Sequence, residues 1–317
     1  MKRPTVRMGT RGSRLALAQA EWVKKRLQSS WPDVEVELVI IRTRGDQVQD
    51  RPFHLMGDQG GIFIKEIEQA LLEDQIDFAV HSGKDVSSQL AHGLILAAIC
   101  LREDPRDVLI SATGQPLDEL PKGARIGTSS LRRQAELLLK RPDLEVVAIR
   151  GNVETRLNKM ESGQVDALIL AAAGLRRLSL DHRITEYLDP KEFIPSPAQG
   201  ALALECRQDD EDVQKILAPL HDEPTGWAVR CERAFLAGLG AGCQIPLAAH
   251  AVCQGQTIVV DGLVAAPDGS EAVRGSRMGD VQQAEALGAD LAKELTQRGA
   301  ERILREWRQS MLRKKDE

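Results

Sequence analysis

The sequence predicts an α/β protein with two similar domains around a cleft, followed by a C-terminal α+β domain with a small antiparallel sheet. The chain has 317 residues, enough for two or three domains that each bury a core. A pattern of strand, turn and helix start occurs twice before residue 200, and the pattern changes after Pro224. These three observations fix the expected architecture.

The repeat consists of three pairs of matching segments in the same order. The pairs are residues 6–13 with 124–131, 34–41 with 144–149, and 75–81 with 164–170. Short aliphatic runs that alternate with helical periods are typical of parallel βαβ units with helices on both sheet faces. Ligands bind such sheets at the carboxyl ends of the strands, so we expect the site in the segments that follow the strands.

The C-terminal part predicts a different arrangement of helices and strands. The expected elements are a helix over 227–239, strands over 248–253, 257–265 and 272–278, and a single helix over 281–305. Tight turns between the strands indicate an antiparallel meander. We expect the tail from Arg313 to Glu317 to be frayed and solvated.

Composition excludes several classes of function. The net charge of −5 gives no global basic field, so we expect no nucleic-acid partner. The five cysteines are odd in number, and no Cys-x-x-Cys pair suggests zinc or a redox dithiol, so we expect no metal and a reducing compartment. With no apolar run near ~20 residues and no apolar signal region, we expect a cytoplasmic protein without membrane contact.

The segments after the strands are rich in groups that bind carboxylates and phosphates. They contain Arg11, Ser13, Lys84, Asp85, Thr128, Ser129, Ser130, Arg132, Arg133, Arg150 and Arg156. Hydroxyls and backbone N–H groups at a helix start favour anions, although Ser and Thr are also ordinary N-caps. A single arginine is more often a solvated surface charge, whereas a cluster facing one cleft indicates a ligand with several carboxylates or phosphates.

Two further features suggest chemistry. Asp85 follows Lys84 after an apolar strand, and at such a cleft its carboxylate is the expected general acid/base, with His81 as a competitor. Cys243 lies in a glycine-rich loop, residues 238–246, where a thiol either carries a group covalently or packs in the core.

Several motifs together resemble the porphobilinogen deaminase family, also called hydroxymethylbilane synthase. The resemblance extends from about Val6 to Arg305 and rests on residues 9–19, 43–46, 80–86, 102–107, 127–134, 150–157 and 242–244. It implies a transferase that deaminates four porphobilinogen molecules and joins them into the linear tetrapyrrole hydroxymethylbilane, early in haem and chlorophyll synthesis. It also implies a dipyrromethane cofactor, joined to Cys243 by a thioether, that serves as a primer.

The resemblance also assigns roles to residues. It implies that the pyrrole carboxylates are bound by Arg11, Arg132, Arg133, Arg150 and Arg156, assisted by Ser13, Lys84, Thr128, Ser129 and Ser130. Asp85 is expected to donate the proton to the leaving amine and to act as the counter-charge to the pyrrole nitrogens of cofactor and substrate. Lys84 is expected to hold a substrate carboxylate and to keep Asp85 ionised between transfers. Gln19 and Gln199 are expected near the cofactor, and Phe63 is expected to stack on a ring. Residues 55–63 depart from the family pattern, since the lysines common there are missing.

We predict three domains in a monomer, with the first domain interrupted by the second. The boundaries are 1–100 with 198–220, 101–197, and 221–317. The main alternative function is a solute-binding or ligand-sensing module, because two similar α/β domains around an anion-binding cleft also describe periplasmic binding proteins and regulator effector domains. Such modules need neither Asp85 nor Cys243. A Cys-His-Asp hydrolase is disfavoured, because no glycine-flanked nucleophile follows a strand and His250 has no evident partner.

Overall fold

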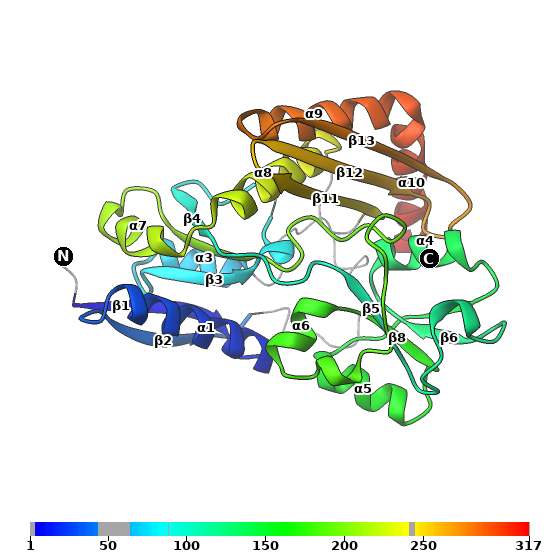
Figure 1. Cartoon of the computed structure of the whole chain (residues 1–317), viewed down its shortest axis with the longest axis horizontal. Helices are drawn as coiled ribbons and strands as arrows, with labels where there is room; N and C mark the ends of the chain where they lie inside the picture. Colours follow the sequence, from blue (N-terminus) through cyan, green and yellow to red (C-terminus); the bar gives the residue numbers. More distant parts are fainter. Residues whose placement is uncertain (1–3, 44–63, 88, 241–244, 317) are drawn as a thin grey trace.

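The computed structural model describes residues 4–43, 64–87, 89–240 and 245–316, with side chains as far as residue 310. Within these residues the chain forms two five-stranded sheets and one three-stranded sheet. In Figure 1 the first sheet with α1 and α3 (blue and cyan) and α7 (yellow-green) lies beside the second sheet (green), and the C-terminal elements (yellow to red) lie above them. The expected fold class is confirmed.

The first sheet has the strand order β2-β1-β3-β10-β4. Its strands are β1 (Thr5–Arg11), β2 (Glu35–Ile41), β3 (Phe78–Ser82), β4 (Leu94–Ile99) and β10 (Leu202–Arg207). The helices that accompany it are α1 (Arg14–Ser30), α3 (Lys65–Leu72) and α7 (Glu211–Leu217). Helix α1 begins directly after β1 because Ser13 caps it, with Oγ accepting a hydrogen bond from the N–H of Ala16.

The second sheet has the corresponding order β7-β6-β8-β5-β9. Its strands are β5 (Asp107–Ser111), β6 (Arg125–Gly127), β7 (Glu145–Val147), β8 (Ala167–Ala171) and β9 (Glu186–Tyr187). Its helices are α4 (Leu131–Lys140), α5 (Val153–Glu161) and α6 (Ala172–Arg177).

Both sheets are mixed, since the parallel βαβ units expected from the sequence are joined by antiparallel strands. Strand β1 is parallel to β2 and β3, and β6 is parallel to β7 and β8. In contrast, β10 runs antiparallel to β3 and β4, and β5 runs antiparallel to β8. The chain leaves the first sheet after β4 and enters the second as β5, then returns from β9 to the first sheet as β10. An aliphatic run in the sequence does not reveal its direction in a sheet.

An ion pair at the strand starts occurs in both sheets. Asp77 accepts hydrogen bonds from the N–H and Nε of Arg7, at 2.6 and 3.1 Å. Asp166 accepts the same two bonds from Arg125, at 2.7 and 3.2 Å. The pairs tie β1 to the residue before β3 and β6 to the residue before β8. These pairs show that the repeat in the sequence is also a repeat of contacts.

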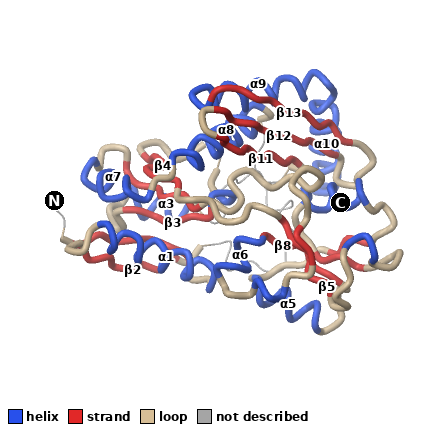
Figure 2. Tube along the Cα trace, viewed as in Figure 1, coloured by secondary structure: helices blue, strands red, loops and turns tan. Residues whose placement is uncertain are grey.

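The C-terminal elements form an antiparallel sheet with helices packed against it (Figure 2). They are α8 (Glu223–Gly238), β11 (Leu247–Gln254), β12 (Thr257–Ala265), β13 (Ala272–Asp280), α9 (Ala284–Leu295) and α10 (Glu301–Asp316). The prediction of a single helix over 281–305 is wrong, because Gly299 has a φ of 110° within the segment Thr296–Ala300 and separates α9 from α10. The backbone of α10 is helical as far as Asp316, whereas the expectation that the tail is frayed and solvated stays a prediction.

The chain crosses between the two five-stranded sheets after β4 and again after β9. The exact domain boundaries drawn from the sequence stay a prediction. No helix among the described residues is both long enough and apolar enough to span a bilayer.

Candidate functional site

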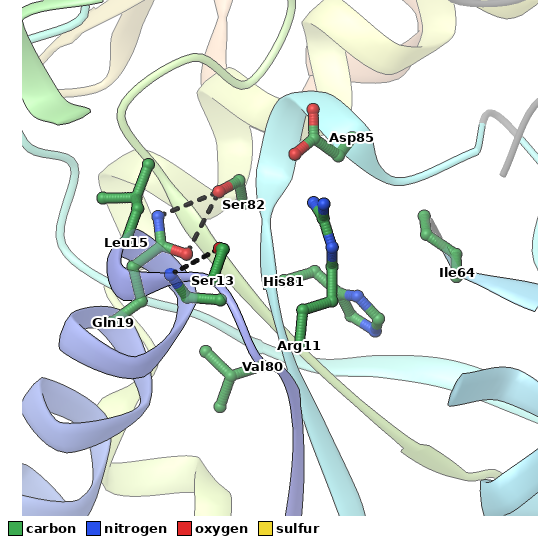
Figure 3. A pocket seen from close by; sticks show the side chains of 10 residues that line it. Arg11, Ser13, Leu15, Gln19, Ile64, Val80, His81, Ser82 and Asp85 are labelled. Carbon is green, nitrogen blue, oxygen red and sulfur yellow. Dashed lines mark hydrogen bonds between the residues drawn. The ribbon is translucent and has the colours of Figure 1, made fainter. Parts of the chain in front are cut away.

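The ends of β1 and β3 meet at a pocket in the first sheet (Figure 3). Because these neighbouring strands are parallel, their carboxyl ends lie at one edge. The pocket is lined by Arg11, Ser13, Leu15, Ala16, Gln19, Ile64, Val80, His81, Ser82 and Asp85. The structure therefore brings together four of the predicted site residues, Arg11, Ser13, Gln19 and Asp85.

The polar groups in the pocket are held by short contacts. The side-chain amide of Gln19 donates a hydrogen bond to Ser82 Oγ at 2.9 Å. In Figure 3 the side chain of Arg11 points toward the carboxylate of Asp85. Asp85 ends a short 3₁₀ turn, Gly83–Asp85, that directly follows β3. This turn presents the acid at the mouth of the pocket.

His81 lines the same pocket but is engaged elsewhere. Its Nε2 lies 2.9 Å from Glu205 Oε2 on β10, and both side chains are buried. The sequence left His81 as an alternative to Asp85 for the role of general acid/base. Nε2 of His81 is therefore engaged by Glu205, whereas the role of Asp85 as the acid stays a prediction.

Lys84 faces the second sheet through Gln199. Its Nζ lies 3.4 Å from Gln199 Oε1, and the same oxygen lies 3.4 Å from Arg133 Nη2. Burial and the neighbouring Arg133 guanidinium lower the pKa of Lys84 to about 8, while Asp85 acts in the opposite direction. The two sheets thus contribute cations to one region.

Arg132 and Arg133 are buried in a network with carboxylates. Asp107 Oδ1 accepts from Arg133 at 3.0 and 2.6 Å, and Asp107 Oδ2 lies 2.6 Å from Arg132 Nη1. Arg132 Nη1 also donates to Glu136 and to the carbonyl of Ile194, both at 2.9 Å. Arg132 Nη1 is therefore used within the protein, and the role of Arg132 toward a ligand stays a prediction.

Sequence reasoning missed the two carboxylates of this network. Although burial alone raises the pKa of Asp107, the two guanidinium groups outweigh burial and hold that pKa well below its usual range. Burial raises the pKa of Glu136 to about 8. A signal for Asp107 was present, since this acid begins an apolar strand where a charge needs a partner.

Arg150 and Arg156 complete the cationic region. Arg156 donates from Nε to the carbonyl of Gly151 at 2.9 Å, and within the described part of the chain it has no carboxylate partner. Burial, together with the charges of Arg133 and Arg150, lowers the pKa of Arg156 to about 10. Burial also lowers the pKa of Arg150. A partly buried cation in like-charged surroundings is stabilised by an anionic ligand.

The hydroxyl segment before α4 has mainly local contacts. Ser130 Oγ caps the helix by accepting from the N–H of Arg133 at 3.4 Å, and Thr128 Oγ1 accepts from the N–H of Ser130 at 3.2 Å. Ser129 Oγ donates to the carbonyl of Ile149 at 2.7 Å. The N-cap alternative is thus correct for Ser130, and any contact of these hydroxyls with a ligand stays a prediction.

Cys243 and Phe63 lie outside the described residues, as do residues 44–46 and 55–62. The other four cysteines are buried or half-buried, and burial raises the pKa of each thiol. Such thiols are poor nucleophiles at neutral pH.

Two family models match the chain. The model described as "Porphobilinogen deaminase, dipyromethane cofactor binding domain" matches residues 6–215, and "Porphobilinogen deaminase, C-terminal domain" matches residues 227–297. A porphobilinogen deaminase of Syntrophotalea carbinolica is 54% identical over 304 residues, which cover 96% of both chains. One of Syntrophobacter fumaroxidans is 49% identical over 301 residues, covering 95% of this chain and 97% of the relative.

Solved structures give a weaker likeness. The methionine-binding protein MetQ covers 68% of this chain and 90% of its own, with 14% identity and a TM-score of 0.41. At this level the likeness adds nothing to the assignment.

Proposed function

Because the chain belongs to the porphobilinogen deaminase family, we propose that it joins four porphobilinogen molecules head to tail into hydroxymethylbilane and releases ammonia. The resemblance recognised in the motifs is confirmed. The chain is a transferase of tetrapyrrole biosynthesis, a hydroxymethylbilane synthase, and it contains the dipyrromethane cofactor-binding domain.

One observation carries the proposal at the level of the site, namely the excess of cations between the two sheets. Lys84, Arg150 and Arg156 have lowered pKa values, and Arg156 has no carboxylate partner in the described residues. Porphobilinogen carries an acetate and a propionate, so a chain of pyrroles is a row of carboxylates. Such a row supplies negative charge to Arg156, whose charged neighbours are Arg133 and Arg150, and the described residues therefore fit the cofactor.

The bound dipyrromethane supplies the pyrrole end to which the first substrate is joined. We assign its thioether to Cys243, and its carboxylates to Ser13, Lys84, Thr128, Ser129, Ser130, Arg132, Arg133, Arg150 and Gln199. For the incoming substrate we assign Arg11, Ser13, Gln19, Phe63, Arg150 and Arg156. Asp85 donates the proton to the leaving amine and then, ionised, stabilises the positive charge left on the pyrrole. Lys84 holds a carboxylate beside it.

The finer statements belong to the same proposal. We infer a cytoplasmic monomer that acts without metal, membrane or nucleic acid. Residues 1–100 with 198–220 and residues 101–197 form the two walls of the cleft, and residues 221–317 carry the cysteine loop.

Substitution of Asp85 tests the assignment of the acid. In Asp85→Asn we expect kcat for ammonia release to fall by roughly 10²–10⁴-fold, the usual contribution of a positioned acid. The matched control is Asp143→Asn, because Asp143 pairs with Arg141 away from the pocket. Full turnover in Asp85→Asn contradicts the role of Asp85, whereas a wild-type chain that releases no ammonia from porphobilinogen contradicts the function itself.

A further inference from the structure

Asp107 is a buried carboxylate at the centre of the site, and the roles assigned above do not include it. It is the first residue of β5, and none of its surface is exposed. Its Oδ1 accepts from Arg133 Nε and Nη2 and, at 3.0 Å, from Gln199 Nε2. Its Oδ2 lies 2.6 Å from Arg132 Nη1. One carboxylate thus organises three side chains that are assigned to the cofactor.

The contacts of Asp107 determine how the amide of Gln199 is oriented. Gln199 is 1% exposed, and its Nε2 donates both to Asp107 and, at 2.7 Å, to the carbonyl of Pro105. With the amide nitrogen used by these two acceptors, Oε1 faces the cations Lys84 and Arg133. The reversed amide would direct N–H groups at two cations and is disfavoured.

We propose that Asp107 is a positioning residue for the site, which fixes Arg133 and the amide of Gln199 and, through Gln199, the ammonium group of Lys84. The link runs from β5 in the second sheet to the turn after β3 in the first. The link also has an electrostatic part, because the negative charge of Asp107 offsets the positive charges of the buried Arg132 and Arg133 side chains. The proposal rests on the proposed function only in naming pyrrole carboxylates as the ligand that these cations meet.

The charges around Lys84 give the proposal a measurable consequence. Asp85, on the same turn, and Asp107, on β5, favour its charged form, while Arg133 and Arg132, both on α4, disfavour it. Removal of the Asp107 charge leaves the arginines unopposed by that group. Coulomb attraction across one intervening amide, at an effective dielectric of ~20, corresponds to about one pH unit. The pKa of Lys84 should therefore fall further.

The experiment measures the titration of Lys84 directly. The full-length chain carrying Cys243→Ser is labelled with acetic anhydride across a pH series, and acetylation of the Lys84 peptide is followed by mass spectrometry. Addition of Asp107→Asn should lower the midpoint by about one pH unit. The matched control is Asp77→Asn, because Asp77 is a buried carboxylate between Arg7 and Arg207 at the opposite end of the sheet. In this control the pH midpoint of Lys84 acetylation should not change.

An unchanged midpoint in a folded Asp107→Asn chain overturns the proposal. If that variant does not fold, as judged by circular dichroism, Gln199→Leu tests the same link with Asp107 retained. It removes the oxygen that faces Lys84, so a downward shift is again expected, and an unchanged midpoint is again contradictory.

Kinetics separate positioning from stability. In the chain with Cys243 intact, Asp107→Asn should raise the KM for porphobilinogen and move the alkaline limb of kcat/KM to lower pH, which Asp77→Asn should not do. The labelling experiment needs no turnover. A chain that carries no primer and releases no ammonia would therefore refute the proposed function and leave the result on Asp107 intact.

Discussion

Glu232 on α8 is expected to be the strongest single electrostatic anchor of the C-terminal elements. Its carboxylate, which is fully buried, accepts from Arg102 Nη1 and Nη2 at 2.7 and 3.1 Å. It also accepts from the N–H groups of Ala198 and Ala251, at 2.6 and 2.7 Å. One acid therefore joins α8 to the segment after β4, to the segment before β10, and to β11.

The buried ion pair of Glu232 with Arg102 contributes substantially to stability. Although burial opposes its ionisation, Arg102 and then His250 lower the pKa of Glu232 from 4.5 to about 2. That difference corresponds to about 3 kcal/mol of stability. Removal of one partner from a buried ion pair typically costs 3–5 kcal/mol. Glu232→Gln should therefore lower the free energy of unfolding by about 3 kcal/mol.

Urea unfolding followed by circular dichroism measures this change. The matched control is Glu211→Gln, because Glu211 pairs with Lys215 on the exposed face of α7, and the expected loss there is below about 0.5 kcal/mol. Because the folded pKa is the lower one, the stabilisation is complete above the unfolded pKa of ~4.5 and is lost as the pH falls toward 2. The gap between wild type and Glu232→Gln should narrow by about half between pH 6 and pH 3. A loss equal to that of the control, or a gap that does not change with pH, refutes the reasoning.

Three further changes have defined outcomes. Arg156→Gln removes a charge-assisted contact with the substrate, so the KM for porphobilinogen should rise roughly 10- to 100-fold, and an unchanged KM contradicts this. The free energy of unfolding of the unloaded chain in urea should rise by about 1 kcal/mol, because a cation in like-charged surroundings is removed. Gly288→Ala should lower the free energy of unfolding by about 1–3 kcal/mol, because the added Cβ collides with the carbonyl oxygen of Cys231 and this outweighs the better helix propensity of alanine. A stabilised variant would show that α8 and α9 move apart easily. Arg14 and Glu154 form an exposed ion pair between α1 and α5, so Glu154→Gln should change the melting temperature by less than about 2 °C, and a larger, salt-independent loss would show a contribution beyond this pair.

Much of the site could be predicted from the sequence, because its residues follow strands directly. Arg11, Ser13 and Asp85 lie at the ends of β1 and β3, and the parallel pairing of these strands brings them together. The internal repeat predicted a second cationic segment after β6, because that strand matches β1 in the repeat. Arg133 of this segment does approach Lys84 through Gln199.

The rest depends on contacts between distant segments. Asp107 and Glu136 acquire their roles only when β5, α4 and the segment before β10 pack together, and no local spacing indicates this. The antiparallel direction of β5 and β10 follows from the chain crossing twice between sheets, while the residues of each strand look alike in either direction. The break at Gly299 interrupts an apolar stripe that continues on both sides of it, so periodicity alone predicts one helix.

The intact mass of the denatured protein tests the central claim most directly, with the wild-type chain measured beside Cys243→Ser. The wild-type mass should exceed the encoded mass by two linked pyrrole units, and the excess should be absent from the variant. An encoded mass for the wild type that persists after incubation with porphobilinogen contradicts the claim.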